Sequence, residues 1–180
     1  MKKSIYKEIE IPESVEASII GNGIINIKGP EGEITRIFKI PKIKLEKKDN
    51  KIFVGSDKAT KTEKKKNITI GTRIQNMVKG VQNKYEYSLK ICSSHFPMTA
   101  EVKDKEFVLK NFFGEKIPRK LKFPEGVETE LKKEDITIKS HDKELAGQIA
   151  ANLERLTRLT SKDRRIFQDG IYITSKPEKH

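Results

Sequence analysis

The sequence predicts an α+β protein made of two tandem duplicated domains, each an antiparallel sheet packed against one main helix. Three observations support this prediction. The 180-residue chain repeats one order of strands followed by a helix, its strand segments alternate apolar and polar residues, and its helix segments carry apolar residues at intervals of three or four. An antiparallel sheet buries one face, and the helix of the same repeat can cover that face.

The strand segments occur as matching pairs in the two halves of the chain. The runs 24–28 and 107–110 alternate in polarity, and each leads to a turn that contains Gly-Glu, at Gly32 or at Gly114. The segment 85–92 also alternates, and we expect it to be a strand that enters the second domain. The remaining expected strands are 15–20, 35–41 and 51–54 in the first half, and 100–103, 118–124 and 135–138 in the second.

Each repeat ends in a helix that has one apolar stripe. Both helices contain Gly and Asn five residues apart, Gly71 and Asn76 in the first and Gly147 and Asn152 in the second. Asp142 is the expected N-cap of the second helix, because its carboxylate can accept hydrogen bonds from free amides of the first turn. We interpret the stripes as core residues: Ile70, Ile74, Met77, Val78 and Val81 in the first helix, and Leu145, Ile149, Leu153 and Leu156 in the second.

The expected domains are residues 1–82 and 83–180, with the boundary just after the first helix. The two halves differ in length between the last strand and the helix. The extra segment of the first half, about 59–67, is polar and cationic. We therefore expect it to be an exposed insertion loop.

The composition favours a polyanion as the partner. The formal net charge is +12 and the pI is about 9.6, and a field of that sign attracts nucleic acid. The chain has 31 Lys and only 7 Arg. Base-composition bias or heat adaptation also produces many lysines, and these can simply be solvated. Such a bias does not explain four arginines within eleven residues, which are Arg155, Arg158, Arg164 and Arg165.

Other classes of protein and site are disfavoured. Cys92 is the single cysteine, so no intrachain disulfide can form, which fits a reducing cytosol. The chain lacks the apolar run of a signal peptide, and no window is long enough to span a membrane. Cys92 and His95 have the spacing of a metal pair, but a structural zinc needs about four ligands. Neither a nucleophile–base set nor a Walker-type or GxGxxG loop occurs, so we expect no enzyme, no cofactor and no metal.

Five segments together resemble the archaeal and eukaryotic branch of ribosomal large-subunit protein six. They occur in the order of that family and cover nearly the whole chain. The bacterial branch typically ends in a Pro-Tyr-Lys-Gly-Lys-Gly type of tail, whereas this chain has Phe-Gln-Asp-Gly at 167–170. The segments that carry the resemblance are 71–81, 94–97, 111–116, 142–154 and 163–172.

The resemblance implies a structural protein of the large ribosomal subunit that binds large-subunit ribosomal RNA (rRNA). It implies a position near the stalk base and the sarcin–ricin stem, where translational GTPases dock transiently, and contacts with neighbouring ribosomal proteins. In the family the C-terminal domain makes most of the RNA contact. The sequence leaves open an alternative, a free basic module such as an RNA chaperone or an architectural DNA-binding protein.

The best candidate RNA surface runs from the end of the second helix into the tail. Arg155 and Arg158 are three residues apart and are expected to share a helix face, where cations also complement the macrodipole. That structural role accounts for one or two arginines, and phosphate contact better explains the cations that follow. Gln168 either reaches RNA or bonds within its own loop, and Tyr172 is expected to pack or hydrogen-bond locally. The candidate residues are Arg155, Arg158, Thr160, Ser161, Lys162, Arg164, Arg165, Gln168 and Lys176.

A second candidate set surrounds the Gly114 turn. It consists of Lys116, Arg119 and Lys120, although residues of this kind can also mark the solvated face of a strand. His95 is expected either to anchor the turn that enters the second repeat or to contact RNA. Net charge points instead to the first half, because residues 1–82 carry +8 and residues 83–180 carry +4. We give more weight to the arginine cluster, since a local cluster makes a contact and a total does not.

Overall fold

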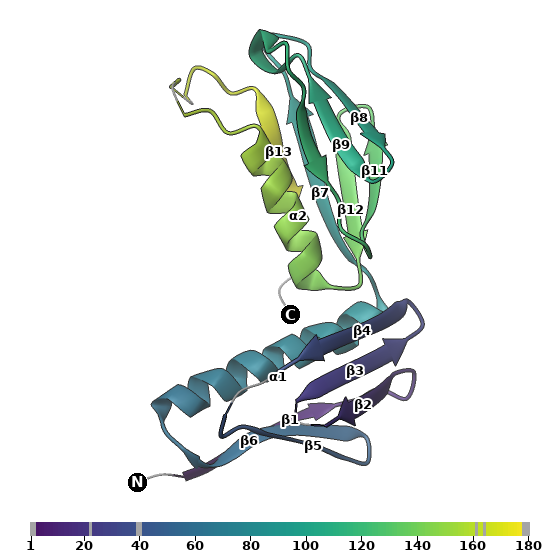
Figure 1. Cartoon of the computed structure of the whole chain (residues 1–180), viewed down its shortest axis with the longest axis vertical. Helices are drawn as coiled ribbons and strands as arrows, with labels where there is room; N and C mark the ends of the chain where they lie inside the picture. The colour runs from purple at the N-terminus through teal and green to yellow at the C-terminus, as the bar shows by residue number, and fades with distance from the viewer. Residues whose placement is uncertain (1–2, 22, 39–40, 161, 164, 178–180) are drawn as a thin grey trace. The chain divides into compact units, whose positions relative to one another are not determined.

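The structure is a computed structural model that describes residues 3–21, 23–38, 41–160, 162–163 and 165–177. Contacts divide the chain into two compact units, Met1–Lys84 and Tyr85–His180, here called the N-terminal and C-terminal units. Each unit combines antiparallel strands with one long helix (Figure 1). This arrangement confirms the predicted α+β duplication. Within the described ranges, neither helix is both long enough and apolar enough to cross a bilayer.

The N-terminal unit contains two three-stranded antiparallel sheets, where one had been expected. The helix α1 (Lys61–Gln82) packs against β1 and β6 of one sheet and against β3 and β4 of the other. The first sheet has the order β1 (Lys3–Glu10), β6 (Lys51–Ala59), β5 (Lys44–Lys48). The second has the order β2 (Glu16–Ile20), β3 (Ile24–Gly29), β4 (Gly32–Ile37).

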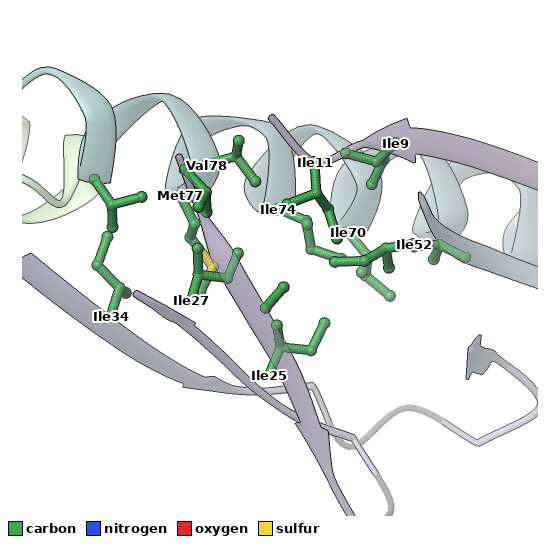
Figure 2. Packing of buried hydrophobic residues seen from close by; sticks show 14 of the residues in the cluster. Ile9, Ile11, Ile25, Ile27, Ile34, Ile52, Ile70, Ile74, Met77 and Val78 are labelled. Carbon is green, nitrogen blue, oxygen red and sulfur yellow. The ribbon is translucent and has the colours of Figure 1, made fainter. Parts of the chain in front are cut away.

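The core of the N-terminal unit lies between α1 and the two sheets. Figure 2 shows Ile70 and Ile74 of α1 on the side of the helix that faces Ile25 and Ile52 of the strands, and all four side chains are buried. Burial of a side chain of this size contributes about 1.5–3 kcal/mol. The apolar stripe predicted for the first helix is therefore a core stripe.

The segment 59–67 is not the exposed loop that the sequence analysis expected. Ala59 ends β6, and α1 begins two residues later. The carboxylate of Glu63 accepts hydrogen bonds from the backbone amide of Thr60, at 2.9 Å, and from the Thr60 hydroxyl. Thr-x-x-Glu is a capping box that starts a helix. The extra residues therefore lengthen α1 by about two turns, and Asn67 is buried within it.

The C-terminal unit repeats this plan and adds one strand. The helix α2 (Lys143–Leu156) begins at the expected N-cap, since the Asp142 carboxylate accepts a 2.9 Å bond from the Glu144 amide. One sheet has the order β11 (Glu128–Lys132), β12 (Asp135–Ser140), β7 (Tyr85–Cys92), β13 (Gly170–Ser175). The other has the order β10 (Arg119–Lys122), β9 (Glu106–Lys110), β8 (Thr99–Lys103), and the short 3-10 helix η1 (Phe112–Gly114) follows β9.

Four strands were not expected from the sequence, and all four lie at the edges of sheets. They are β1, β5, β11 and β13. β5 and β11 consist mostly of charged residues and bury little, so their sequences lack a strong alternation of apolar and polar residues. The edge strands β2, β4, β8 and β10 were expected from the sequence, so an edge position alone does not hide the pattern of a strand.

Each helix has a glycine where it packs tightly against a strand. A Cβ atom on Gly71 would lie 2.5 Å from Cδ of Lys7, and one on Gly147 would lie 3.0 Å from the Tyr87 hydroxyl. Lys7 and Tyr87 occupy matching positions in β1 and β7, which pair with β6 and β12. The glycine of each repeat thus serves the same close contact between helix and sheet.

Replacement of Gly29 by Ala is expected to destabilise the N-terminal unit. A Cβ atom there would lie 2.8 Å from both the carbonyl oxygen and Cγ2 of Val81, which is fully buried at the end of α1. Overpacking of this kind costs about 1–3 kcal/mol. Chemical denaturation of Gly29→Ala measures the loss, with Ser18→Ala on the exposed face of β2 as the control. Equal stability of the two variants would contradict this account.

Candidate nucleic-acid interface

Three segments of the C-terminal unit converge at one place. They are the turn 93–97 between β7 and β8, the helix η1, and the loop 157–169 between α2 and β13, here called the C-terminal loop. The ring of His95 stacks on Phe167 with centroids 5.2 Å apart, and Phe113 meets Phe167 edge-on at 5.7 Å. Each segment contains part of a motif that carries the family resemblance, so the fold brings separate motifs together.

The two ends of the C-terminal loop are tied to each other. The buried hydroxyl of Thr157 accepts a 3.0 Å bond from the Ile171 amide and donates a 3.2 Å bond to the Glu154 carbonyl. A Cβ atom on Gly170 would lie 3.2 Å from the same hydroxyl, so glycine permits the close approach. Because the two ends of this long loop are joined, its central residues project from a fixed position on the unit.

Asp169 joins the C-terminal loop to the turn 93–97. The residue is only 3% exposed, and its carboxylate accepts bonds from the backbone amides of Ser94, at 2.9 Å, and His95, at 3.0 Å. The Ser94 hydroxyl and Nδ1 of His95 complete the set, at 2.5 and 3.0 Å. Burial raises the pKa of the Asp169 carboxyl, but these hydrogen bonds outweigh it and hold the pKa well below its usual range. His95 therefore anchors the turn, one of the two roles expected for it.

Lys162 is held over the aromatic rings of the same cluster. Its Nζ lies 4.7 Å from the ring centroid of Phe113 and 4.6 Å from that of Phe167. Phe113 has a left-handed backbone with a φ of 49°, and so does Asn111, whose side-chain amide donates a 2.9 Å bond to the Pro97 carbonyl. Such backbone conformations persist only where surrounding contacts enforce them. The rings of Phe113 and Phe167 thus hold the ammonium group of Lys162 in place while the residue stays exposed to solvent.

Arg155 and Arg158 do not share a helix face, contrary to expectation. α2 ends at Leu156, and Arg158 lies two residues beyond it because Thr157 caps the helix. Both arginines are exposed. Within the described part of the chain, no hydrogen bond or ion pair involves either guanidinium. They are therefore available to an anion, and Arg155 also lies where it complements the helix macrodipole.

Arg165 is exposed but has a partner. Its guanidinium contacts the Asp163 carboxylate at 2.8 Å, and its side chain is still 89% exposed. These bonds lower the pKa of the Asp163 carboxyl. Gln168 donates a 3.1 Å bond to the Arg165 carbonyl, and the Tyr172 hydroxyl donates a 2.7 Å bond to the Gln168 carbonyl. The local bonds considered for Gln168 and Tyr172 are therefore present, and Arg165 and Gln168 line an open pocket of about 730 Å³.

Arg119 is committed to contacts within the protein. Its guanidinium forms two bonds to the Glu115 carboxylate, at 2.6 and 2.8 Å, and one of 2.6 Å to the Leu156 carbonyl at the end of α2. It also lies 4.3 Å from the ring centroid of the buried Phe112. The bonds lower the pKa of the Glu115 carboxyl. Arg119 therefore joins β10 to α2.

The other candidate residues fall into two groups. Lys116, Thr160 and Lys176 are exposed, and Lys120 is exposed on the face of β10 with its Nζ 3.7 Å from the Glu106 carboxylate. Ser161 and Arg164 lie outside the described residues, as does Lys179 in the tail. Of the residues that the structure describes, no three His, Cys, Asp or Glu side chains are grouped to hold a metal ion.

Sequence reasoning missed the residues that support this site. Asp169 and Thr157 were not singled out, because an isolated Asp or Thr in a loop has no periodic signal. Phe113 and Phe167 were quoted within motifs but given no role. The usable signal was the presence of aromatic residues in the separate motifs 94–97, 111–116 and 163–172, together with Asp169 in the last, since buried polar groups need partners.

Asp169→Asn is expected to destabilise the C-terminal unit by about 2–3 kcal/mol at pH 7, because buried bonds to a charged acceptor are lost. The folded-state pKa of Asp169 is depressed below the unfolded value of about 3.9. Its contribution to stability is therefore present above that value and is lost as pH falls toward the folded pKa. Urea denaturation should show a gap between Asp169→Asn and the parent protein that narrows below about pH 4. A gap that does not depend on pH in that range would contradict the assignment.

Arg119→Lys is expected to lower stability even though the charge is kept. Lysine cannot reproduce the fork that bonds Glu115 and the end of α2 together. We expect a loss of about 1–2 kcal/mol in thermal or urea denaturation. Lys116→Arg, at an exposed site nearby, is the matched control. An unchanged stability for Arg119→Lys would mean that these contacts do not support the unit.

Comparisons with known proteins place this chain in a family. The family model described as ribosomal protein L6 matches residues 11–84 and again residues 96–170. The large ribosomal subunit protein uL6 of Sulfurisphaera tokodaii is 43% identical over 96% of this chain and 92% of its own length. The proteins of the same name from Staphylothermus marinus and Methanobrevibacter smithii are 45% and 40% identical, over 94% and 96% of this chain and 93% and 97% of theirs. The resemblance drawn from the motifs is confirmed, and the chain belongs to the ribosomal protein L6 family.

Proposed function

We propose that this chain is a structural, non-catalytic constituent of the large ribosomal subunit in the cytoplasm, and that it binds large-subunit rRNA through the C-terminal unit. The observation that carries the proposal is the set of exposed cations on the firmly anchored C-terminal loop and the adjoining end of α2. Arg155, Arg158 and Lys162 are exposed there, while Asp169 and Thr157 fix the ends of the loop. The names of the relatives, large ribosomal subunit proteins, agree with this assignment.

The cations differ in how readily they can reach phosphate. Arg155 and Arg158 can form fork-shaped contacts with phosphate oxygens without giving up an ion pair in the described chain. Lys162 reaches phosphate as a point charge held by two rings. Arg165 exchanges the Asp163 carboxylate for phosphate, and such exposed pairs contribute little to stability.

The remaining candidates take smaller roles in the proposal. Thr160, Ser161 and Arg164 lie among the cations of the cluster in the sequence, Gln168 and Lys176 follow it, and Lys116 belongs to the Gly114 turn; these residues add further contacts in the proposal. The ring of His95 is stacked on Phe167 and its Nδ1 is bonded to Asp169, so His95 acts mainly by holding the turn 93–97 against the C-terminal loop. Arg119 acts by positioning the end of α2, and Lys120 marks the solvated face of β10.

The finer placement rests on the family resemblance. We propose a position near the stalk base and the sarcin–ricin region, where the protein supports the binding site of translation factors. Its partners there are neighbouring large-subunit proteins and, transiently, translational GTPases. The alternative is a free basic module that binds DNA and RNA alike, and sedimentation separates the two because only a ribosomal constituent follows the large-subunit peak through high salt.

The double substitution Arg155→Glu with Arg158→Glu is expected to impair incorporation of the chain into large subunits. Two phosphate contacts become repulsive, so the affinity of the purified chain for large-subunit rRNA falls about tenfold or more, and the salt slope falls by about 2. The measurements are co-sedimentation in a high-salt sucrose gradient and RNA binding at several salt concentrations. Circular dichroism establishes that the variant is folded.

Lys64→Glu with Lys65→Glu is the matched control, because it makes the same change of charge on the exposed side of α1. We expect this control to keep its salt slope and its place in the subunit. Equal losses in both variants would show that total charge, and not the C-terminal loop, decides binding. Absence of the unchanged chain from the large-subunit peak would reject the proposed function as a whole.

A further inference from the structure

Three isoleucines form a row on the outer face of the sheet β2-β3-β4. Ile20 pairs with Ile24 across β2 and β3, and Ile24 pairs with Ile37 across β3 and β4. The neighbouring residues Ile25 and Ile27 point to the core and are fully buried, so Ile24 points away from it. Ile20 is 55% exposed and Ile37 is 57% exposed. Ile24 between them is half-buried, so the row is apolar and is open to solvent mainly at its two ends.

The other rows on the same face are polar. The next row consists of Ser18, Asn26 and Thr35. The row beyond it consists of Glu16, Lys28 and Glu33, and the members of both rows are cross-strand partners. This polarity is what a solvated sheet face requires. Apolar character is confined to the end of the sheet where the isoleucines lie.

The C-terminal unit supplies an internal comparison for this row. Its equivalent strands place Lys103 opposite Glu106, and Glu106 opposite Lys122. The equivalence follows from the buried residues, since Phe107 and Leu109 occupy the positions of Ile25 and Ile27. The same row of the same fold is thus charged in one unit and made of isoleucine in the other. The fold itself does not require apolar residues there.

Cross-strand pairing of β-branched residues is a competing explanation, because such pairs stabilise a sheet. Threonine is also β-branched and has a high strand propensity, yet threonine and serine occur only in the neighbouring row. Scattered exposed apolar residues are normal on a protein surface, whereas a contiguous exposed patch marks an interaction site. An apolar row across three strands belongs to the second kind.

We infer that the isoleucine row of Ile20, Ile24 and Ile37 is a docking surface for an apolar segment of another protein within the large subunit. The inference rests on the proposed function, which places the chain among other proteins. RNA is disfavoured as the occupant, because the row offers neither a cation to phosphate nor a donor to a base. A second copy is disfavoured because three partly exposed isoleucine side chains cover much less than the roughly 800 Å² per partner of a stable dimer.

A small apolar contact suits a protein whose main affinity comes from elsewhere. RNA contact by the C-terminal unit supplies the affinity, and the isoleucine row then needs only to fit a neighbour that is already close. The partner presents aliphatic or aromatic side chains, because only these gain by leaving water against isoleucine. Its contact excludes water from the row but leaves the polar row of Ser18, Asn26 and Thr35 at the rim.

A photo-crosslinking experiment tests this inference on assembled particles. The full chain with a benzophenone amino acid in place of Ile37 is reconstituted into archaeal large subunits that have been stripped of their own family member. Irradiation is expected to join position 37 to a protein, identified by mass spectrometry. Cross-links only to rRNA, only to a second copy, or to nothing in particles that contain the chain would overturn the inference. Failure of the chain to enter the particle would instead count against the proposed function.

A pair of substitutions separates docking from sheet stability. Ile20→Thr with Ile37→Thr keeps β-branching but removes apolar surface. Because position 37 is then changed, a benzophenone amino acid in place of Ile24 measures the contact in both the variant and the parent. We expect the yield of the protein cross-link to fall about tenfold, with incorporation and melting temperature close to those of the parent. Lys103→Thr with Lys122→Thr, at the equivalent positions of the C-terminal unit, is the control and should leave the yield unchanged. An unchanged yield in the isoleucine variant would overturn the inference.

Discussion

The carboxylate of Asp169 fixes the geometry on which the candidate interface depends. It is almost wholly buried, and it accepts hydrogen bonds from Ser94 and His95, which are distant in the sequence. A buried charge without partners would be strongly unfavourable, so the two loops must meet to satisfy it. The same bonds bring the His95 ring onto Phe167, and Lys162 then lies over the aromatic surface. The position of the exposed Lys162 thus depends on a carboxylate that is itself almost wholly buried.

Duplication gives the two units one scaffold and different surfaces. In each, a helix glycine lets the helix approach the same strand position, where Lys7 or Tyr87 packs. The C-terminal unit adds β13 beside β7, and this strand brings the C-terminal loop back to the sheet. The N-terminal unit has no counterpart of β13 among its described residues, but carries an extended helix and an isoleucine row. Changes at edges and outer faces leave the shared core intact, so each unit can specialise separately.

Periodicity predicted the parts of the fold that bury apolar residues on a regular face. The strands containing Ile25 and Phe107, the helix stripes and the Asp142 cap all follow from local patterns. The edge strands β5 and β11 bury too little to show such a pattern. The role of Asp169 is not visible locally either, because it depends on contacts some 75 residues away in the sequence. The start of α1 could have been predicted in place of an exposed loop, since Thr60 and Glu63 form a local capping signal.

The arginines show why total charge is a poor guide to a binding surface. Arg119 holds Glu115 and the end of α2, so its release to a ligand would leave a helix carbonyl and a carboxylate without their donor. Arg165 gives up only an exposed pair with Asp163, which water can replace. Arg155 has no such pair to break within the described chain. A cation is therefore a better candidate for phosphate contact when fewer groups of the protein lose a hydrogen-bond or ion-pair partner as it turns to phosphate. By this measure, the cations at the end of α2 and on the C-terminal loop are better candidates for RNA contact than the lysines of the N-terminal unit, although that unit has the larger net charge. Lysines of its sheet lie beside acidic residues such as Glu8 and Glu46.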